Sequence, residues 1–277
     1  MAETPPAMPN CVQDDFSEPL SHGACAMTAL AFPDDGTRLF VNEDDDDHGL
    51  VFDKNADGTL TFVSESTDRF RIQGLATSPA GDVLYNGLNV YDVSGDGIIS
   101  SVVSIDGGNA TELMSFDGAD LLVTTVRNQW LEVLDLADPR APESVARLTP
   151  SVSGTRYQAH SDDGSRFVVV GQEGIASVIF DGETLEEQDA AEVTLSGDGC
   201  LECSFQAITR KVDLTGDGAF AIAGTFIVRY DDAAKEAFPD QGLVTTFSVD
   251  PATGELAELA SAPLANKVRD ILLVEPQ

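Results

Sequence analysis

The acidic run from Glu43 to His48, with the sequence EDDDDH, is the densest group of potential ligands in the chain. Neighbouring carboxylates repel one another unless a cation or solvent relieves the repulsion. Oxygen-rich sites suit Ca²⁺, and a second acidic pair lies in a long connection that could approach the first. The sequence therefore predicts a calcium site with the candidate ligands Glu43, Asp44, Asp46, His48, Asp231 and Asp232. The alternative is a solvated acidic loop in an acidic protein.

Basic residues are rare, which makes their placement informative. The chain has 15 lysines and arginines against 48 aspartates and glutamates, for a formal net charge of −33. Several arginines fall in or near connections of variable length, where they could surround an anionic ligand beside the single tryptophan. The predicted ligand-binding residues are Arg71, Arg127, Trp130, Arg229 and Arg269. The alternatives are arginines paired with nearby carboxylates, and a core position for Trp130, which begins a strand pattern.

The charge balance excludes two classes of partner. Nucleic acids and anionic membranes need basic surface to neutralise their phosphates, and this chain repels both. No apolar run approaches the ~18 residues of a membrane-spanning helix. We therefore expect no nucleic-acid partner, no membrane insertion, and a monomer that binds a small-molecule or protein ligand. The acidic surface is also consistent with a solubility device in salty surroundings, where charges are screened.

Four cysteines form two local pairs, Cys11 with Cys25 and Cys200 with Cys203. An even number at short separations predicts disulfides and an oxidising compartment. A four-thiolate zinc site and a redox CxxC pair are the alternatives, although the second pair lies between strand patterns rather than at a helix start. The first residues lack the basic and apolar regions of a signal peptide. The sequence therefore predicts a mature extracellular or periplasmic protein, with residues 1–25 as an extended arm.

Self-similar units follow one another along the chain at intervals of roughly 40 to 50 residues. Each unit is expected to contain four strands joined by two tight turns and one polar loop, because its apolar runs are bounded by Asp-Gly or Pro. Aligning the first turns superposes Gly36, Gly81, Gly118, Gly164 and Gly218. The units cover residues 28–66, 72–105, 111–149, 156–195 and 205–262. Units of four strands that cannot bury both faces alone are typical of a β-propeller.

Two segments resemble known propeller repeats. LEVLDLADPRAPESVARLT is similar to the LVIVD-type repeat, and TALAFPDDGTRLFV followed by GLVFDKNADGTLTFV is similar to blades of bacterial lactonase-type propellers. The resemblance covers about residues 26–262 and implies blades rather than a reaction. We therefore predict an all-β fold, a single small β-propeller of four-stranded antiparallel blades over residues 26–277. Five blades are favoured, with a strand from residues 267–276 closing the ring; a sixth blade that includes residues 1–25 is the alternative.

The predicted turns fall on two rims. The turns between the first and second strands, and between the third and fourth, are short and uniform, so their glycines and aspartates are expected to serve turn geometry. The opposite rim varies in length and content, which favours it for binding. His160 aligns with the ends of the other inner strands and is expected to pack there.

The predicted function follows from this rim and from missing motifs. No GxSxG, HExxH or phosphate-binding glycine motif is present. The preferred function is therefore an exported acidic propeller that binds a ligand or a protein through its variable rim. A calcium-dependent, lactonase-like hydrolase with the metal in the channel mouth is the alternative, and a carbohydrate-binding module is a third. Whether the protein is an enzyme stays open at this point.

Overall fold

The structure is a computed structural model that describes residues 27–43, 48–69, 74–103, 108–126, 129–171, 174–192, 203–231, 236–237 and 241–264. All regular structure in these residues is β-strand. The same residues contain no helix with the length and apolar character to cross a membrane. The all-β prediction is confirmed.

Within the described ranges, twenty-one strands form five antiparallel sheets, one for each repeat of the sequence. The first sheet contains β1 (Met27–Ala31), β2 (Arg38–Glu43), β3 (His48–Lys54) and β4 (Leu60–Arg69). The second contains β5 (Ala76–Thr77), β6 (Val83–Asn86), β7 (Asn89–Val93) and β8 (Ile99–Val103). The third contains β9 (Gly108–Phe116), β10 (Ala119–Val126), β11 (Trp130–Asp135) and β12 (Glu143–Leu148).

The last two sheets repeat this plan. The fourth contains β13 (Tyr157–His160), β14 (Arg166–Gly171), β15 (Gly174–Phe180) and β16 (Leu185–Glu192). The fifth contains β17 (Cys203–Leu214), β18 (Phe220–Asp231), β20 (Gln241–Val249) and β21 (Leu256–Leu264), with the short β19 (Glu236–Ala237) paired to β18.

The glycines that align the repeats lie in the predicted turns. Gly36, Gly81, Gly118, Gly164 and Gly218 all have positive φ, between 58° and 79°. Glycine adopts this left-handed conformation without the steric cost that a Cβ atom imposes. The repeat glycines are therefore explained by turn geometry.

The sheets pack against one another in chain order, and each interface has its own apolar core. The sheets approach face to face because alternate residues of a strand point to opposite sides and both sides carry apolar residues. Representative pairs, from the first interface to the last, are Phe40 with Leu84, Tyr85 with Leu122, Val123 with Val169, and Val170 with Ala223. This stacking of sheets that share cores is the arrangement of propeller blades.

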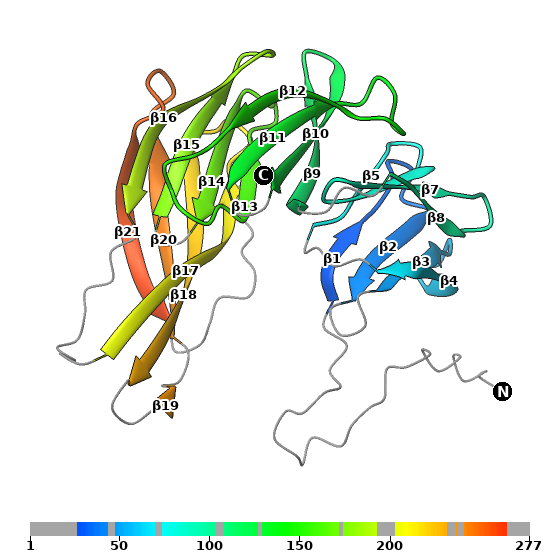
Figure 1. The fold of residues 1–277 in the computed structure, drawn as a ribbon, viewed down its shortest axis with the longest axis horizontal. Coiled ribbons are helices and arrows are strands. Elements are labelled where there is room, and N and C mark those ends of the chain that lie inside the picture. Colours follow the sequence, from blue (N-terminus) through cyan, green and yellow to red (C-terminus); the bar gives the residue numbers. More distant parts are fainter. Residues whose placement is uncertain are drawn as a thin grey trace.

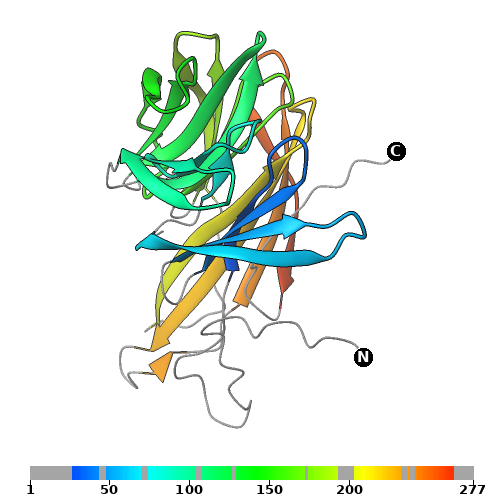
Figure 2. The same ribbon diagram turned by 90° about the vertical axis from the view of Figure 1, so that its right-hand side faces the viewer.

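The five sheets follow an arc, with the first strand of each sheet innermost and the last outermost (Figure 1). The first and fifth sheets lie at the two ends of the arc, and their described strands share no extensive contact. In the view turned by 90°, the first sheet lies in front of the fifth (Figure 2). The predicted arm, residues 1–25, and the predicted closing strand, residues 267–276, lie outside the described residues.

The third sheet differs from the others in the phase of its apolar residues. Its first turn contains only Asp117 and Gly118, both with positive φ, whereas the first turns of the other sheets are longer. Val123 and Val169 stand at the same distance from their turn glycines, yet both lie in the core between the third and fourth sheets. Val123 and Val169 therefore face each other. If the third sheet had the same alternation relative to its turn glycine as the fourth, Val123 would face the second sheet.

Candidate functional site

The predicted calcium ligands fall largely outside the described side chains. The backbone of Glu43 ends β2 opposite Met27, and His48 begins β3 opposite Arg69. Asp231 ends β18 opposite Cys203 and Glu236, and the structure does not describe Asp44, Asp46 or Asp232. No cluster of three or more metal-ligating side chains occurs among the residues that are described. The calcium site stays a prediction.

The predicted anion-binding residues are likewise mostly outside the described side chains. Arg71, Arg127 and Arg269 lie in segments that are not described, and Arg229 is described only as a backbone position in β18 opposite Phe205. Cys203, the only cysteine in a described strand, has no described side chain, so the disulfides also stay predictions. Trp130 is the one predicted ligand-binding residue with a described side chain.

Trp130 is half-buried at the start of β11, the third strand of its sheet. Its indole N–H donates to Glu132 Oε2 at 3.3 Å, and the Arg147 guanidinium lies 4.9 Å from the ring centroid. Arg147 also donates to Glu132 Oε1 at 2.7 Å. These internal partners hold the indole against its own sheet, and they favour the packing alternative for Trp130 over a ligand platform.

The turn rim is the set of first-to-second and third-to-fourth strand turns, residues 32–37, 55–59, 78–82, 94–98, 117–118, 136–142, 161–165, 181–184, 215–219 and 250–255. Asp163 is representative, because it accepts hydrogen bonds from Ser161 and from the backbone and hydroxyl of Ser165. These bonds lower the pKa of the Asp163 carboxyl. The turn-rim aspartates therefore serve turn geometry, as the sequence predicts.

Polar residues also gather where the inner strands of the third and fourth sheets meet. Glu112 pairs in its strand with Val123, so it faces the fourth sheet. Gln158 and His160 pair with Val169 and Phe167, so they face the third sheet. Arg156 precedes β13 by one residue and lies two residues from Gln158 along the chain. We call Glu112, Arg156, Gln158 and His160 the inner polar cluster.

Gln158 is the most deeply buried member of the inner polar cluster. Its residue exposure is 2%, and neither its amide nitrogen nor its amide oxygen has a hydrogen-bond partner in the described structure. Buried polar side chains nearly always have partners, supplied by protein, water or ligand. The amide therefore has one donor group and one acceptor that are buried and unpaired between the two sheets.

His160 links the same two sheets. Nδ1 lies 2.9 Å from the carbonyl oxygen of Ser161, and Nε2 lies 3.2 Å from the carbonyl oxygen of Leu113 in β9. Its ring also meets the ring of Phe167 edge to face, with centroids 6.2 Å apart. The prediction that His160 packs at the end of its inner strand is confirmed. Its contacts hold the third and fourth sheets in register beside Gln158.

Glu112 is half-buried, and protein atoms surround its carboxyl. Removal from water raises the pKa of Glu112 to about 7, and the Asp213 carboxylate acts in the same direction. Electrostatic interactions with His160 and Lys211 oppose this rise. A carboxyl with a pKa near neutrality can exchange a proton with a bound molecule at physiological pH.

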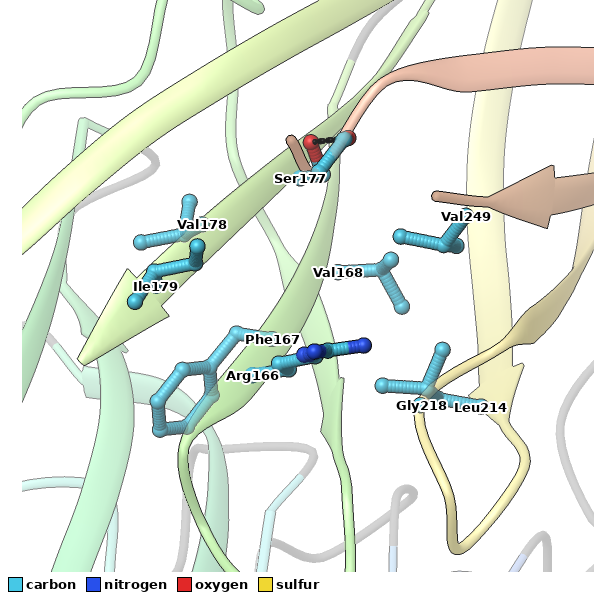
Figure 3. A pocket seen from close by; sticks show the side chains of 10 residues that line it. Arg166, Phe167, Val168, Ser177, Val178, Ile179, Leu214, Gly218 and Val249 are labelled. Carbon is cyan, nitrogen blue, oxygen red and sulfur yellow. Dashed lines mark hydrogen bonds between the residues drawn. The ribbon is translucent and has the colours of Figure 1, made fainter. Parts of the chain in front are cut away.

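A small cavity lies between the fourth and fifth sheets (Figure 3). Its volume is about 10 Å³, and its lining includes Phe167, Val168 and Val249. The Ser177 hydroxyl beside it donates to the carbonyl oxygen of Gly254 at 2.5 Å, so its polar group is already satisfied. This volume admits one water molecule. The cavity is a packing void rather than a substrate site.

The repeats of the sequence contain a signal for Glu112 and Gln158 that no catalytic or binding motif provides. Both stand six residues before the aligned turn glycine of their repeat. The other three repeats have apolar residues at this position, Leu30, Leu75 and Val212. Polar residues at a repeat position that is otherwise apolar indicate a role other than packing in the core.

Comparisons with known proteins identify the fold. No known family matches the sequence, and no curated protein matches it either. The periplasmic gluconolactonase PpgL of Pseudomonas aeruginosa is similar in structure, with 16% identity, a TM-score of 0.54, and coverage of 86% of this chain and 85% of that chain. A putative 6-phosphogluconolactonase of Bacteroides fragilis has 13% identity, a TM-score of 0.50, and coverage of 89% and 86%.

The name of a third similar structure does not mention a lactonase. The β-propeller domain of Cps50 (Swd1) from Myceliophteria thermophila has 15% identity, a TM-score of 0.51, and coverage of 85% of this chain and 83% of that chain. At such low identities these similarities show the fold alone, and the structure supplies the five four-stranded sheets that the fold requires. The chain is a β-propeller whose similar structures include lactonase-like proteins.

Proposed function

We propose that the protein binds a small polar molecule at the inner polar cluster, between the inner strands of the third and fourth sheets. The observation that carries the proposal is the Gln158 amide, 2% exposed and without a described hydrogen-bond partner. A buried polar group without a partner costs about 1–3 kcal/mol. A ligand with hydroxyl groups offers both a donor and an acceptor, so it recovers this cost on binding.

The test is ligand-observed NMR with a panel of polyols, hydroxy acids and lactones. We expect at least one compound to bind the wild-type protein and to bind Gln158→Leu at least 10-fold more weakly. Ser177→Ala is the matched control, because its buried hydroxyl already has a partner; this variant should bind like the wild type. Binding that is equal in all three proteins, or no binding at millimolar concentrations, contradicts the proposal.

Lactone hydrolysis is a second candidate function, favoured by the pKa of about 7 for Glu112. The names of two similar structures, a gluconolactonase and a putative 6-phosphogluconolactonase, support the same chemistry. In this reaction the Glu112 carboxylate takes a proton from water as the water oxygen bonds to the lactone carbonyl carbon. The ring C–O bond then breaks, and its oxygen takes the proton back from Glu112, which leaves the open hydroxy acid.

Hydrolysis of glucono-1,5-lactone and related lactones in a pH-stat tests this candidate. Glu112→Gln keeps the shape of the side chain and loses the base, so kcat should fall roughly 100-fold or more while KM changes little. Ser177→Ala should retain the wild-type kcat. A wild-type rate no faster than spontaneous hydrolysis, or an unchanged kcat in Glu112→Gln, removes the candidate.

A further inference from the structure

The backbone of Arg156 in the inner polar cluster is held by two hydrogen bonds. Its N–H donates to the carbonyl oxygen of Val170 at 2.9 Å, and Val170 is the residue that pairs with Tyr157 in β13. Its own carbonyl oxygen accepts a hydrogen bond from the Thr125 hydroxyl at 2.7 Å. The two bonds tie Arg156 to the third and fourth sheets at once. Its side chain therefore starts from a rigid position, which suits a binding residue.

The guanidinium of Arg156 has no partner in the described structure, unlike the other arginines with described side chains. Arg38 pairs with Asp53 at 2.9 Å, and Arg140 and Arg147 also contact carboxylates. Arg166 donates to the carbonyl oxygen of Pro251. Arg156 is half-buried, and its Nε is fully enclosed without an acceptor. Such isolation is unexpected in a chain with 48 acidic residues and 15 basic ones.

We propose that Arg156 binds the acidic group of the ligand, so that the inner polar cluster takes a small organic anion that also carries hydroxyl groups. This inference rests on the proposed function, because Gln158 supplies the hydroxyl contacts. A guanidinium presents a planar fork of N–H donors that matches a carboxylate or a phosphate. Either acidic group fits this chemistry.

The spacing of the two residues sets the size of the ligand. Arg156 and Gln158 are two residues apart, so their Cα atoms lie at most roughly 7 Å apart along the chain. The acidic group and the nearest bound hydroxyl are therefore separated by a few carbon atoms. The net charge of −33 does not prevent binding of such an anion, because salt screens distant charges beyond about 8 Å and the local guanidinium is unpaired.

The test is calorimetry with matched anionic and neutral probes. Gluconate is compared with sorbitol, ribonate with ribitol, and glycerol 3-phosphate with glycerol, so each pair differs in the acidic group. We expect at least one anion to bind at least 10-fold more tightly than its neutral counterpart. Arg156→Met should lose this preference, and Arg156→Lys should retain part of it because it keeps the charge. The carboxylate and phosphate pairs distinguish the two acidic groups.

Arg140→Met is the matched control, because Arg140 lies on the turn rim with Asp82 and Asp92; it should bind the anion like the wild type. Melting temperatures of all variants check that each is folded. Neutral probes that bind as well as anions, with Gln158 required and Arg156 dispensable, overturn this inference and leave the proposed function intact. No binding of any probe overturns both.

Discussion

At the turn rim, many polar side chains have their partners within the protein, whereas at the inner polar cluster Gln158 and Arg156 do not. The Asp163 carboxylate accepts bonds from Ser161 and Ser165, and Arg38 joins the first sheet to the second through Asp53 and the carbonyl oxygens of Ser94 and Gly95. Gln158 and the Arg156 Nε are buried, yet they contact no described acceptor or donor.

The difference distinguishes polar groups that stabilise the fold from polar groups that are available to bind a ligand. A satisfied polar group stabilises the fold by about 1 kcal/mol, whereas an unsatisfied one costs free energy that something else must offset. Charge and polarity alone do not make this distinction, because the turn rim is the more acidic of the two regions. The distinction depends on partners, and partners are visible only in the folded protein.

The largest expected effect compares two glycines of the turn rim. Gly164 has φ +68°, and a Cβ there would lie 2.7 Å from the carbonyl oxygen of Ser115 in the third sheet. Gly36 has φ +58°, and a Cβ there would meet nothing within 4 Å. Gly164→Ala should therefore destabilise the protein by roughly 2–4 kcal/mol, from backbone strain plus overlap, and Gly36→Ala by about 1–2 kcal/mol from strain alone.

Urea unfolding measures both glycine variants. Equal losses of stability would show that the close packing of the turn rim against the neighbouring sheet adds nothing to the strain of the turn. That outcome would weaken the contrast with the inner polar cluster, because the rim would then be a set of independent turns.

A second prediction concerns the pH dependence of stability at Glu112. Its pKa is raised from 4.5 to about 7 in the folded protein, so the native state binds more protons than the unfolded state between these values. Stability therefore falls as the pH rises through this window, by at most about 3 kcal/mol at neutral pH. His160, Asp213 and Lys211 influence the same carboxyl, so the comparison is made against Glu112→Gln.

Unfolding free energies at pH 4.5, 6 and 7.5 test this prediction. The turn-rim aspartates have lowered pKa values and act in the opposite direction, but they are present in both proteins. The difference between wild type and Glu112→Gln should thus change with pH in favour of the variant. A difference that is constant from pH 4.5 to 7.5 would show that Glu112 keeps an ordinary pKa.

The repeats were sufficient to predict the sheets but not the site. Gly36 and its equivalents punctuate the chain at positions where only glycine avoids strain, so the strand order follows from local rules. The inner polar cluster depends on the phase of the third sheet, which turns Glu112 towards Gln158. Glu112 and Gln158 have the same spacing from their turn glycines, which predicts that both face the same direction around the ring. Their facing arrangement is a tertiary property that no local pattern contains.

The smallest expected effect tests the comparison most directly. Gln158→Leu replaces a buried amide without described partners by an apolar side chain of similar size, beside the apolar Val169 and Val123. Removing an unsatisfied group should raise the free energy of unfolding by about 1–2 kcal/mol in the absence of ligand. The same change should abolish ligand binding, so stability and function should move in opposite directions.

Ser177→Ala supplies the opposite case, because its hydroxyl has a partner in Gly254. Its loss should lower stability by about 1 kcal/mol and leave binding unchanged. If Gln158→Leu also lowers stability, ordered water already satisfies the amide in the free protein, and the cost of the unpaired group is not what a ligand recovers. If Gln158→Leu is more stable than the wild type and no longer binds, the amide destabilises the free protein and is needed only for ligand binding.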